Sequence, residues 1–249
     1  MFAKNKQALD TMRIAGKLLA EIFENVNSVI QPGRSTASID AWIEQQLVQK
    51  NLVSQSKGYK GYRHVSCISV NNVVVHGVPS EQVILQLGDY VKVDVCAAWN
   101  FYCADMARGF IVGSVHNEKV QHLMTIARQA LDKGIAQAIV GNRLYDISAA
   151  IQQHIEQFGY GIVRDFAGHG IGKRMHENPD VPNFGTAGTG MRLAEGMTFA
   201  IEPMITQGSY EVFVDRDGWT VKTKDGMLAA HVEDTIAITA NGPEILTRP

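Results

Sequence analysis

The sequence predicts a single domain of the α/β (α+β) class, in which a pair of helices followed by strands occurs twice. Hydrophobic residues make up 45% of the 249 positions and charged residues 19%, ordinary values that exclude a disordered or fibrous chain. That length allows one large unit or two small ones. Because no low-complexity linker interrupts the chain, we predict one domain over residues 1–249.

The first fifty residues predict two helices that are separated at Pro32. Apolar residues recur at helical spacing on both sides of this proline, and Ser35 is one of the hydroxyl residues that could cap the second helix. The composition then becomes typical of strands in residues 65–75 and 83–112.

A second pair of helices is predicted in residues 117–140 and 145–158. Strand-like runs follow near residues 197–205, 211–214 and 230–239. Because this order repeats that of the first half, we hypothesise an internal repeat with halves of about 1–112 and 113–249. The segments that match between the halves are only weakly alike, so the sequence does not establish a duplication.

Charge and composition argue against several classes of function. The net charge is −2 without a cluster of Lys and Arg, which argues against a nucleic-acid partner. The longest apolar runs are far shorter than the roughly 20 residues that span a bilayer, so no membrane association is expected. Three cysteines, Cys67, Cys96 and Cys103, cannot form a disulfide framework, which predicts a cytoplasmic location. We also expect a monomer, although no sequence feature reports on assembly.

Two aspartates lie on a predicted hairpin. Valines alternate with polar residues in the strand around Asp94, so this carboxylate points away from the valine face. A turn at Trp99-Asn100 would place Asp94 opposite Asp105, about 5 Å apart, where like charges repel unless a proton or cation lies between them. It would also place Cys96 opposite Cys103, which predicts either two space-filling residues or an oxidation-sensitive pair. Because Trp-Asn suits such a turn poorly, a different register with solvated carboxylates is the alternative.

Three further residues suggest a metal site. His169 lies in a glycine-rich loop, and Glu202 and Glu233 interrupt apolar strands, where a carboxylate is costly to bury unless it is paired or bound to a metal. Each has an ordinary structural explanation, but all five together indicate cations. Four carboxylates would balance two divalent ions, and oxygen ligands with one imidazole suit Mn, Fe, Co or Zn. Such a pair predicts hydrolysis of an amide or ester.

These residues, with the segments Val75–Pro79 and Met175–Glu177, resemble the type I methionine aminopeptidases over nearly the whole chain. The resemblance implies the pita-bread fold, with pseudo-twofold halves around a curved antiparallel sheet. It also implies removal of the initiator methionine from peptides and nascent proteins with a small second residue, using two divalent ions (Co, Mn, Fe or Zn).

The resemblance also implies roles for single residues. Asp105 and Glu233 would bridge the ions, Asp94 would chelate one of them, and His169 and Glu202 would complete the other. Glu202 would also be the general base and acid.

Two further histidines would contact the peptide. His176 would stabilise the oxyanion, and His76 would contact the peptide nitrogen or carbonyl. The residues expected to line the methionine pocket are Tyr59, Tyr62, Cys67 and Trp219. Tyr59 and Tyr62 lie in the loop of residues 57–62, and surface tyrosines in a loop of this kind more often have no catalytic role.

Four positions depart from the family pattern: Cys96, Met106, Ala200 and Asp234. The first three stand where hydroxyl residues are usual, and the related proline-specific peptidases carry an aspartate at the fourth. The alternatives are therefore a proline-specific aminopeptidase or dipeptidase of the same fold, or a catalytically weak peptide-binding paralogue. Only 75 residues precede His76, which leaves little room for the extra domain of the proline enzymes.

Overall fold

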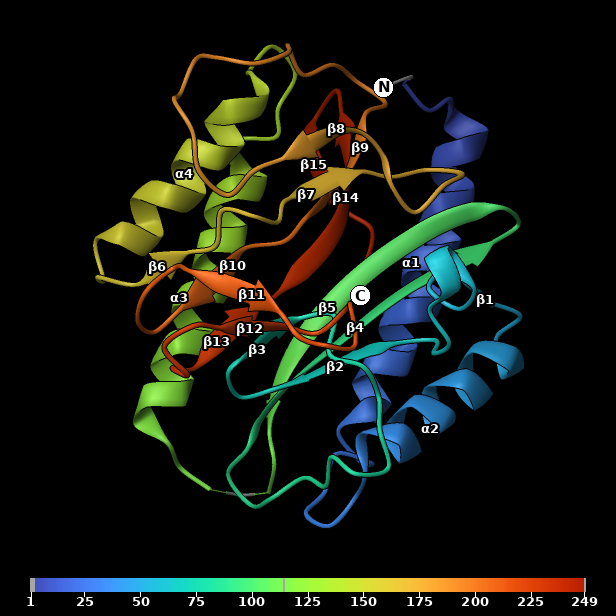
Figure 1. Ribbon diagram of the computed structural model, residues 1–249. Helices are drawn as coiled ribbons and strands as arrows, with labels where there is room; N and C mark the ends of the chain where they lie inside the picture. The colour runs from blue at the N-terminus through green and yellow to red at the C-terminus, as the bar shows by residue number, and fades with distance from the viewer. Residues whose placement is uncertain (1–2, 114, 249) are drawn as a thin grey trace.

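A curved antiparallel sheet forms the centre of the computed structural model, which describes residues 3–113 and 115–248 (Figure 1). Within these residues it has nine strands: β1 (Val53–Ser54), β2 (Cys67–Val70), β4 (Tyr90–Trp99), β5 (Tyr102–Ile111), β7 (Gly168–Gly170), β8 (Glu177–Val181), β9 (Thr198–Ile201), β14 (Glu233–Thr239) and β15 (Gly242–Ile245). The order is β1-β4-β5-β14-β9-β7-β8, with β2 beside β4 and β15 beside β14. The two halves of the chain therefore meet where β5 pairs with β14.

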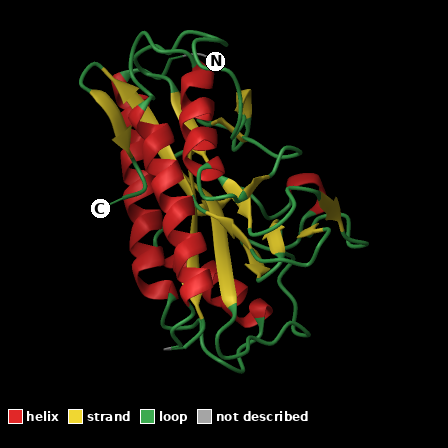
Figure 2. Cartoon of the chain, turned by 90° about the vertical axis from the view of Figure 1, so that its left-hand side faces the viewer, coloured by secondary structure: helices red, strands yellow, loops and turns green. Residues whose placement is uncertain are grey.

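Two small sheets accompany the large one in the described part of the chain. The first joins β13 (Ala229–His231), β10 (Met204–Thr206) and β6 (Gly161–Ile162) in that order. The second joins β11 (Val212–Val214), β12 (Val221–Thr223) and β3 (Val73–Val75), and a short 3-10 helix covers Tyr59–Gly61. Figure 2 shows the long helices on one side of the molecule and most loops and short strands on the other.

Both predicted helix pairs are confirmed. The helices are α1 (Lys6–Val26), α2 (Thr36–Gln49), α3 (Glu118–Ala136) and α4 (Leu144–Glu156). Ser35 caps α2 as predicted, because its hydroxyl accepts a hydrogen bond from the backbone N–H of Ser38 at 3.1 Å. No helix among the described residues has the length and apolar character needed to cross a membrane.

Each helix pair covers its own half of the sheet. Leu19 of α1 and Ile43 of α2 share one core with Val93 of β4. Leu131 of α3 and Ile147 of α4 belong to a second core with β9 and β14. Burial of each such side chain stabilises the fold by about 1.5–3 kcal/mol, so these contacts hold the helices against one face. The opposite face remains available for polar side chains; whether the halves arose by duplication stays a prediction.

The face predicted for Asp94 is confirmed, but the predicted register of its hairpin is wrong. The turn lies at Asn100-Phe101 instead of Trp99-Asn100, and both turn residues have positive φ angles, 44° and 70°. Two adjacent positive φ angles characterise a type I′ turn, and asparagine tolerates them better than a bulky tryptophan does. Trp99 therefore remains in the strand, paired with Tyr102.

The register shift of two residues changes which residues are opposite one another. Asp105 pairs with Cys96, and Asp94 pairs with Ala107, so the two aspartates share a face but lie diagonally. Cys103 lies opposite Ala98, so the predicted direct Cys96–Cys103 pairing is wrong, and both residues are free thiols.

Candidate active site

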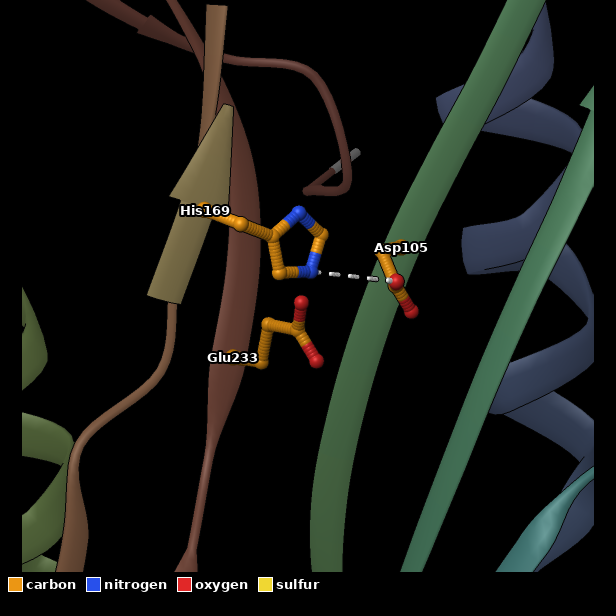
Figure 3. Close-up of side chains that lie close together, drawn as sticks. All are labelled: Asp105, His169 and Glu233. Atoms are coloured by element: carbon orange, nitrogen blue, oxygen red, sulfur yellow. Dashed lines mark ion pairs between the residues drawn. The ribbon is translucent and has the colours of Figure 1, made fainter. Parts of the chain in front are cut away.

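The five predicted metal ligands converge on one pocket. Asp94 and Asp105 come from the β4–β5 hairpin, and Glu233 begins β14. His169 lies in β7, and Glu202 follows the last residue of β9. Figure 3 shows Asp105, His169 and Glu233 pointing toward one another from three different strands. Residues far apart in the sequence thus meet because neighbouring strands of one sheet carry them.

The spacing of these side chains leaves room for an ion. His169 Nε2 is 3.8 Å from Asp105 Oδ2 and 3.6 Å from Glu202 Oε1. Both separations exceed ordinary hydrogen-bond lengths. Ligand atoms of Asp105, His169 and Glu233 all lie within 4.8 Å of one another. This arrangement is what several ligands of a common cation require.

The orientation of His169 is fixed by local backbone. Its Nδ1 lies 3.0 Å from the carbonyl oxygen of Gly170, which can only accept a hydrogen bond. The proton therefore resides on Nδ1, and the lone pair of Nε2 faces the carboxylates. Gly168 allows β7 to lie close to β9, because a Cβ there would stand only 2.5 Å from the carbonyl oxygen of Ala200.

Asp105 is held through its backbone by Thr235. The Thr235 hydroxyl accepts a hydrogen bond from the Asp105 N–H at 2.8 Å and donates one to the Asp105 carbonyl oxygen at 2.8 Å. Thr235 thereby positions the Asp105 backbone, and the carboxylate itself accepts hydrogen bonds from the Cys96 thiol and the backbone N–H of Met106.

Two buried carboxylate oxygens of the site have no hydrogen-bond partner. Within the described residues, Asp105 Oδ1 and Glu233 Oε1 are buried without a hydrogen-bond donor. Such atoms are costly unless a cation or proton satisfies them. Burial, reinforced by Asp105, raises the pKa of Asp94 to about 8, and burial alone raises that of Glu202 to about 8. Burial together with the neighbouring Glu202 raises the pKa of Asp105 to about 7, and burial together with Asp105 raises that of Glu233 well above its usual value.

The donor set fits divalent transition metals. Burial lowers the pKa of His169 to about 4, so its imidazole is neutral at physiological pH and can act as a ligand. Carboxylate oxygens combined with imidazole nitrogen suit Mn, Fe, Co or Zn. The residues present therefore fit the predicted ions.

His176 and His76 flank the five ligands. The ring of His176 lies 4.3 Å from that of His169, centroid to centroid, and Tyr59 Oη lies 3.2 Å from His176 Nδ1. His76 follows β3 with a φ of 56°, an uncommon conformation for a non-glycine residue, and its ring packs edge-on against Phe166. Both predicted histidines line the pocket.

The four predicted pocket residues line the same cavity: Tyr59, Tyr62, Cys67 and Trp219. Tyr62 packs edge-on against Trp219 with ring centroids 5.0 Å apart, and its hydroxyl donates to the Ser66 carbonyl oxygen at 2.9 Å. Tyr62 is only 5% exposed, which excludes the alternative of a free surface tyrosine. Asp217 holds the loop that carries Trp219, because its Oδ1 accepts a hydrogen bond from the backbone N–H of Trp219 at 2.9 Å.

Three residues of the site region received no role in the sequence analysis: His231, Phe166 and Met175. His231 lies two residues before Glu233, and strand alternation would have placed both side chains on one face. Met175 was noted only as part of the segment Met175–Glu177, and no pattern in the sequence marked Phe166, since a single apolar residue in a loop carries no spacing signal.

Comparisons with known proteins identify the family. Residues 10–240 match the model of metallopeptidase family M24. The chain belongs to this family. Methionine aminopeptidase of Clostridium acetobutylicum is 45% identical, aligned over 98% of this chain and 97% of its own length. Methionine aminopeptidase 1 of Bacillus subtilis is 40% identical over 100% of this chain and 99% of its own.

The solved structures confirm the pita-bread fold of this metallopeptidase. The crystal structure of methionine aminopeptidase from Thermotoga maritima superposes with a TM-score of 0.97 at 40% identity, and each chain covers the other completely. Prolidase from Pyrococcus furiosus shares the fold with a TM-score of 0.77 at 24% identity, but this chain covers only 65% of it. This prolidase therefore shares the fold of the present chain but is a longer protein.

The four departures of this metallopeptidase divide between the two faces of the sheet. Asp234 and Met106 are paired on the helix side, where Asp234 binds Arg248 at 2.6 Å and Met106 joins the apolar core. Ala200 lies beside His169, and the thiol of Cys96 hydrogen-bonds the Asp105 carboxylate. Asp234 is therefore a structural residue here, which removes it as an argument for a proline-specific site.

Metal-free protein should lose stability as the pH rises from about 6.5 to about 8. Unfolded carboxyl groups, with pKa values near 4, are ionised throughout this range. Folded Asp94, Asp105 and Glu202 keep protons until pH 7 to 8, so the folded state binds more protons and raising the pH removes them. Each proton contributes up to about 1.4 kcal/mol per pH unit.

Thermal melts in chelator between these pH values measure the effect. Neutral histidines such as His169 oppose the effect mainly at the low end of this pH range, because their unfolded pKa is near 6.5. Metal-loaded protein is the control, and its melting temperature should not fall, since metal binds the deprotonated ligands. A melting temperature that rises with pH in chelator would contradict the buried carboxylate cluster.

Proposed function

We propose that this protein is a methionine aminopeptidase that releases the initiator methionine from peptides and nascent proteins whose second residue is small. The observation that carries the proposal is one pocket that combines the carboxylate–histidine cluster with an aromatic slot. The full-length similarity to methionine aminopeptidases supports the same activity.

The metal ligands are proposed to be Asp94, Asp105, His169, Glu202 and Glu233. Asp105 and Glu233 come from the paired strands β5 and β14 at the centre of the cluster, which suits a bridging role between two ions. Asp94 lies on one side of this pair, and His169 and Glu202 lie close together on the other, so each side would complete one ion. Bound divalent ions (Co, Mn, Fe or Zn) would activate a water molecule and polarise the scissile carbonyl.

Glu202 is proposed as the residue that moves the proton. Its carboxylate lies 3.6 Å from His169 and retains exposure toward the pocket, with 13% of the side chain accessible. A carboxylate at this position can accept a proton from the attacking water and pass it to the departing amine. Glu202 is the first residue after β9, so it lies at the beginning of a loop.

His176 and His76 are proposed to hold the substrate peptide. His176 stands exposed at the pocket, and Tyr59 fixes its ring through Nδ1, so Nε2 is available to a substrate oxygen. A hydrogen bond there would stabilise the charge that develops on the carbonyl oxygen. His76 lines the pocket, and its ring packs edge-on against Phe166. It would contact the peptide nitrogen or carbonyl.

The aromatic slot is proposed to bind the methionine side chain. Tyr62 and Trp219, packed edge-on against each other, line this slot together with Tyr59 and Cys67. Thioether sulfur makes favourable contacts with aromatic rings, which distinguishes methionine from other apolar residues of similar length.

The partner is therefore the N-terminus of a peptide. We do not expect nucleic acid to bind, because the net charge is −2. Three free thiols are consistent with a reducing cytoplasm, and we retain a monomer as the expected state.

A substrate panel tests the proposed function. Met-Ala-Ser should be hydrolysed in the presence of Mn²⁺ or Co²⁺ and not in chelator, whereas Leu-Ala-Ser, Met-Trp-Ser and Ala-Pro peptides should react at least about tenfold more slowly. Asp105→Asn should abolish turnover and metal binding, and the exposed control Glu118→Gln should leave both unchanged. Preference for Ala-Pro peptides, or equal cleavage after leucine and methionine, would contradict the proposal.

Removal of the His176 imidazole tests its role separately. His176→Ala should lower kcat by about 10²–10³ with a smaller change in KM, because an interaction made mainly in the transition state is lost. His116→Ala, which removes an exposed imidazole elsewhere, is the matched control. Steady-state kinetics on Met-Ala-Ser give the comparison, and a rise in KM at unchanged kcat would make His176 a ground-state binding residue instead.

A further inference from the structure

A second buried imidazole faces the metal ligands. His231 is the last residue of β13 and is 2% exposed. Its Nε2 lies 3.5 Å from Glu202 Oε2 and 3.9 Å from Glu233 Oε2. Among the described residues, this nitrogen has no hydrogen-bond partner. A buried nitrogen directed at two carboxylates without bonding either requires an explanation.

The surroundings of His231 repeat those of His169. His169 Nε2 lies 3.6 Å from one oxygen of Glu202, and His231 Nε2 lies 3.5 Å from the other. Each imidazole also lies within 4 Å of a second carboxylate, Asp105 or Glu233. Two ligands that each bind one ion at about 2 Å are typically about 3–4 Å apart, a separation that both imidazoles show.

A direct hydrogen bond to Glu202 explains these distances less well. Such a bond would bring nitrogen and oxygen to about 2.7–3.2 Å, and a charged pair closer still. A neutral imidazole can present an unprotonated nitrogen to a metal.

The backbone of His231 is held from both sides. His231 pairs with Met204 in the small sheet. The buried side-chain nitrogen Nζ of Lys92 donates to the carbonyl oxygens of Asn71 at 2.8 Å and Ala229 at 3.0 Å, which ties β13 to the β4 side of the site. Such anchoring lets a side chain act as a ligand without first being ordered.

We propose that His231 is a sixth protein ligand of the metal centre, binding through Nε2 the divalent ion held between Glu202 and Glu233. This inference rests on the metal centre of the proposed function. An added nitrogen donor favours Co, Zn and Fe over Mn, because imidazole suits these ions better than it suits manganese. His231 would therefore raise the affinity of the site and bias its choice of metal.

Cobalt provides a direct count of bound histidines. In Co²⁺-loaded wild-type protein, proton NMR should show strongly shifted ring resonances from two histidines, because His169 and His231 both contact the paramagnetic ion. His231→Gln should remove one set and retain the other. In calorimetric titrations the same variant should bind Co²⁺ at least about tenfold more weakly and lose less affinity for Mn²⁺. The control His122→Gln, an exposed imidazole on α3, should change neither measurement.

The outcomes separate this inference from the proposed function. Shifted resonances from one histidine in wild-type protein, or unchanged Co²⁺ affinity in His231→Gln, would overturn the role of His231 and leave the metallopeptidase intact. Failure of the wild-type protein to bind Co²⁺ at all would instead overturn the proposed metal centre. The wild-type resonance count needs no variant, so it decides the question even if His231→Gln does not fold.

Discussion

The constraint on which the structure depends is the burial of several carboxylates on one face of a sheet. An ion of this kind costs several kcal/mol to bury, and like charges within a few Å add to that cost. Asp105 and Glu233 each have a buried carboxylate oxygen with no hydrogen-bond donor within the described residues. Cations or protons are therefore needed to neutralise these charges. Metal binding and stability are therefore expected to be coupled, because the groups that destabilise the metal-free protein are those proposed to bind the ions.

The architecture separates this costly cluster from the forces that offset it. The helix pairs place their apolar contacts on one face of the sheet, where Val93 and Phe199 lie in the two cores. Strand alternation then directs Asp94 and His169 to the other face. The same separation places Met106 and Asp234 on the helix side of the sheet, whereas Cys96 contacts a proposed ligand directly.

Much of this arrangement could be predicted from the sequence, because alternation and helical periodicity are local. Strand alternation correctly predicted the face on which Asp94 lies, and helical periodicity correctly predicted both helix pairs. The hairpin register could not be predicted in this way, since it depends on which residues adopt positive φ, and Phe101 does so against its usual preference. His231 was missed although strand alternation would have placed it on the same face as Glu233. In the structure the two residues belong to different strands and different sheets, because β13 ends at His231 and β14 begins at Glu233.

The central claim is that the clustered carboxylate and imidazole side chains bind two divalent ions. Anomalous diffraction from crystals grown with Mn²⁺ tests it most directly, because it locates the ions independently of activity. The account predicts two peaks about 3.5–4 Å apart, lying between Asp105 and Glu233. A single peak outside this cluster, or no peak at a Mn²⁺ concentration that supports turnover, would contradict it.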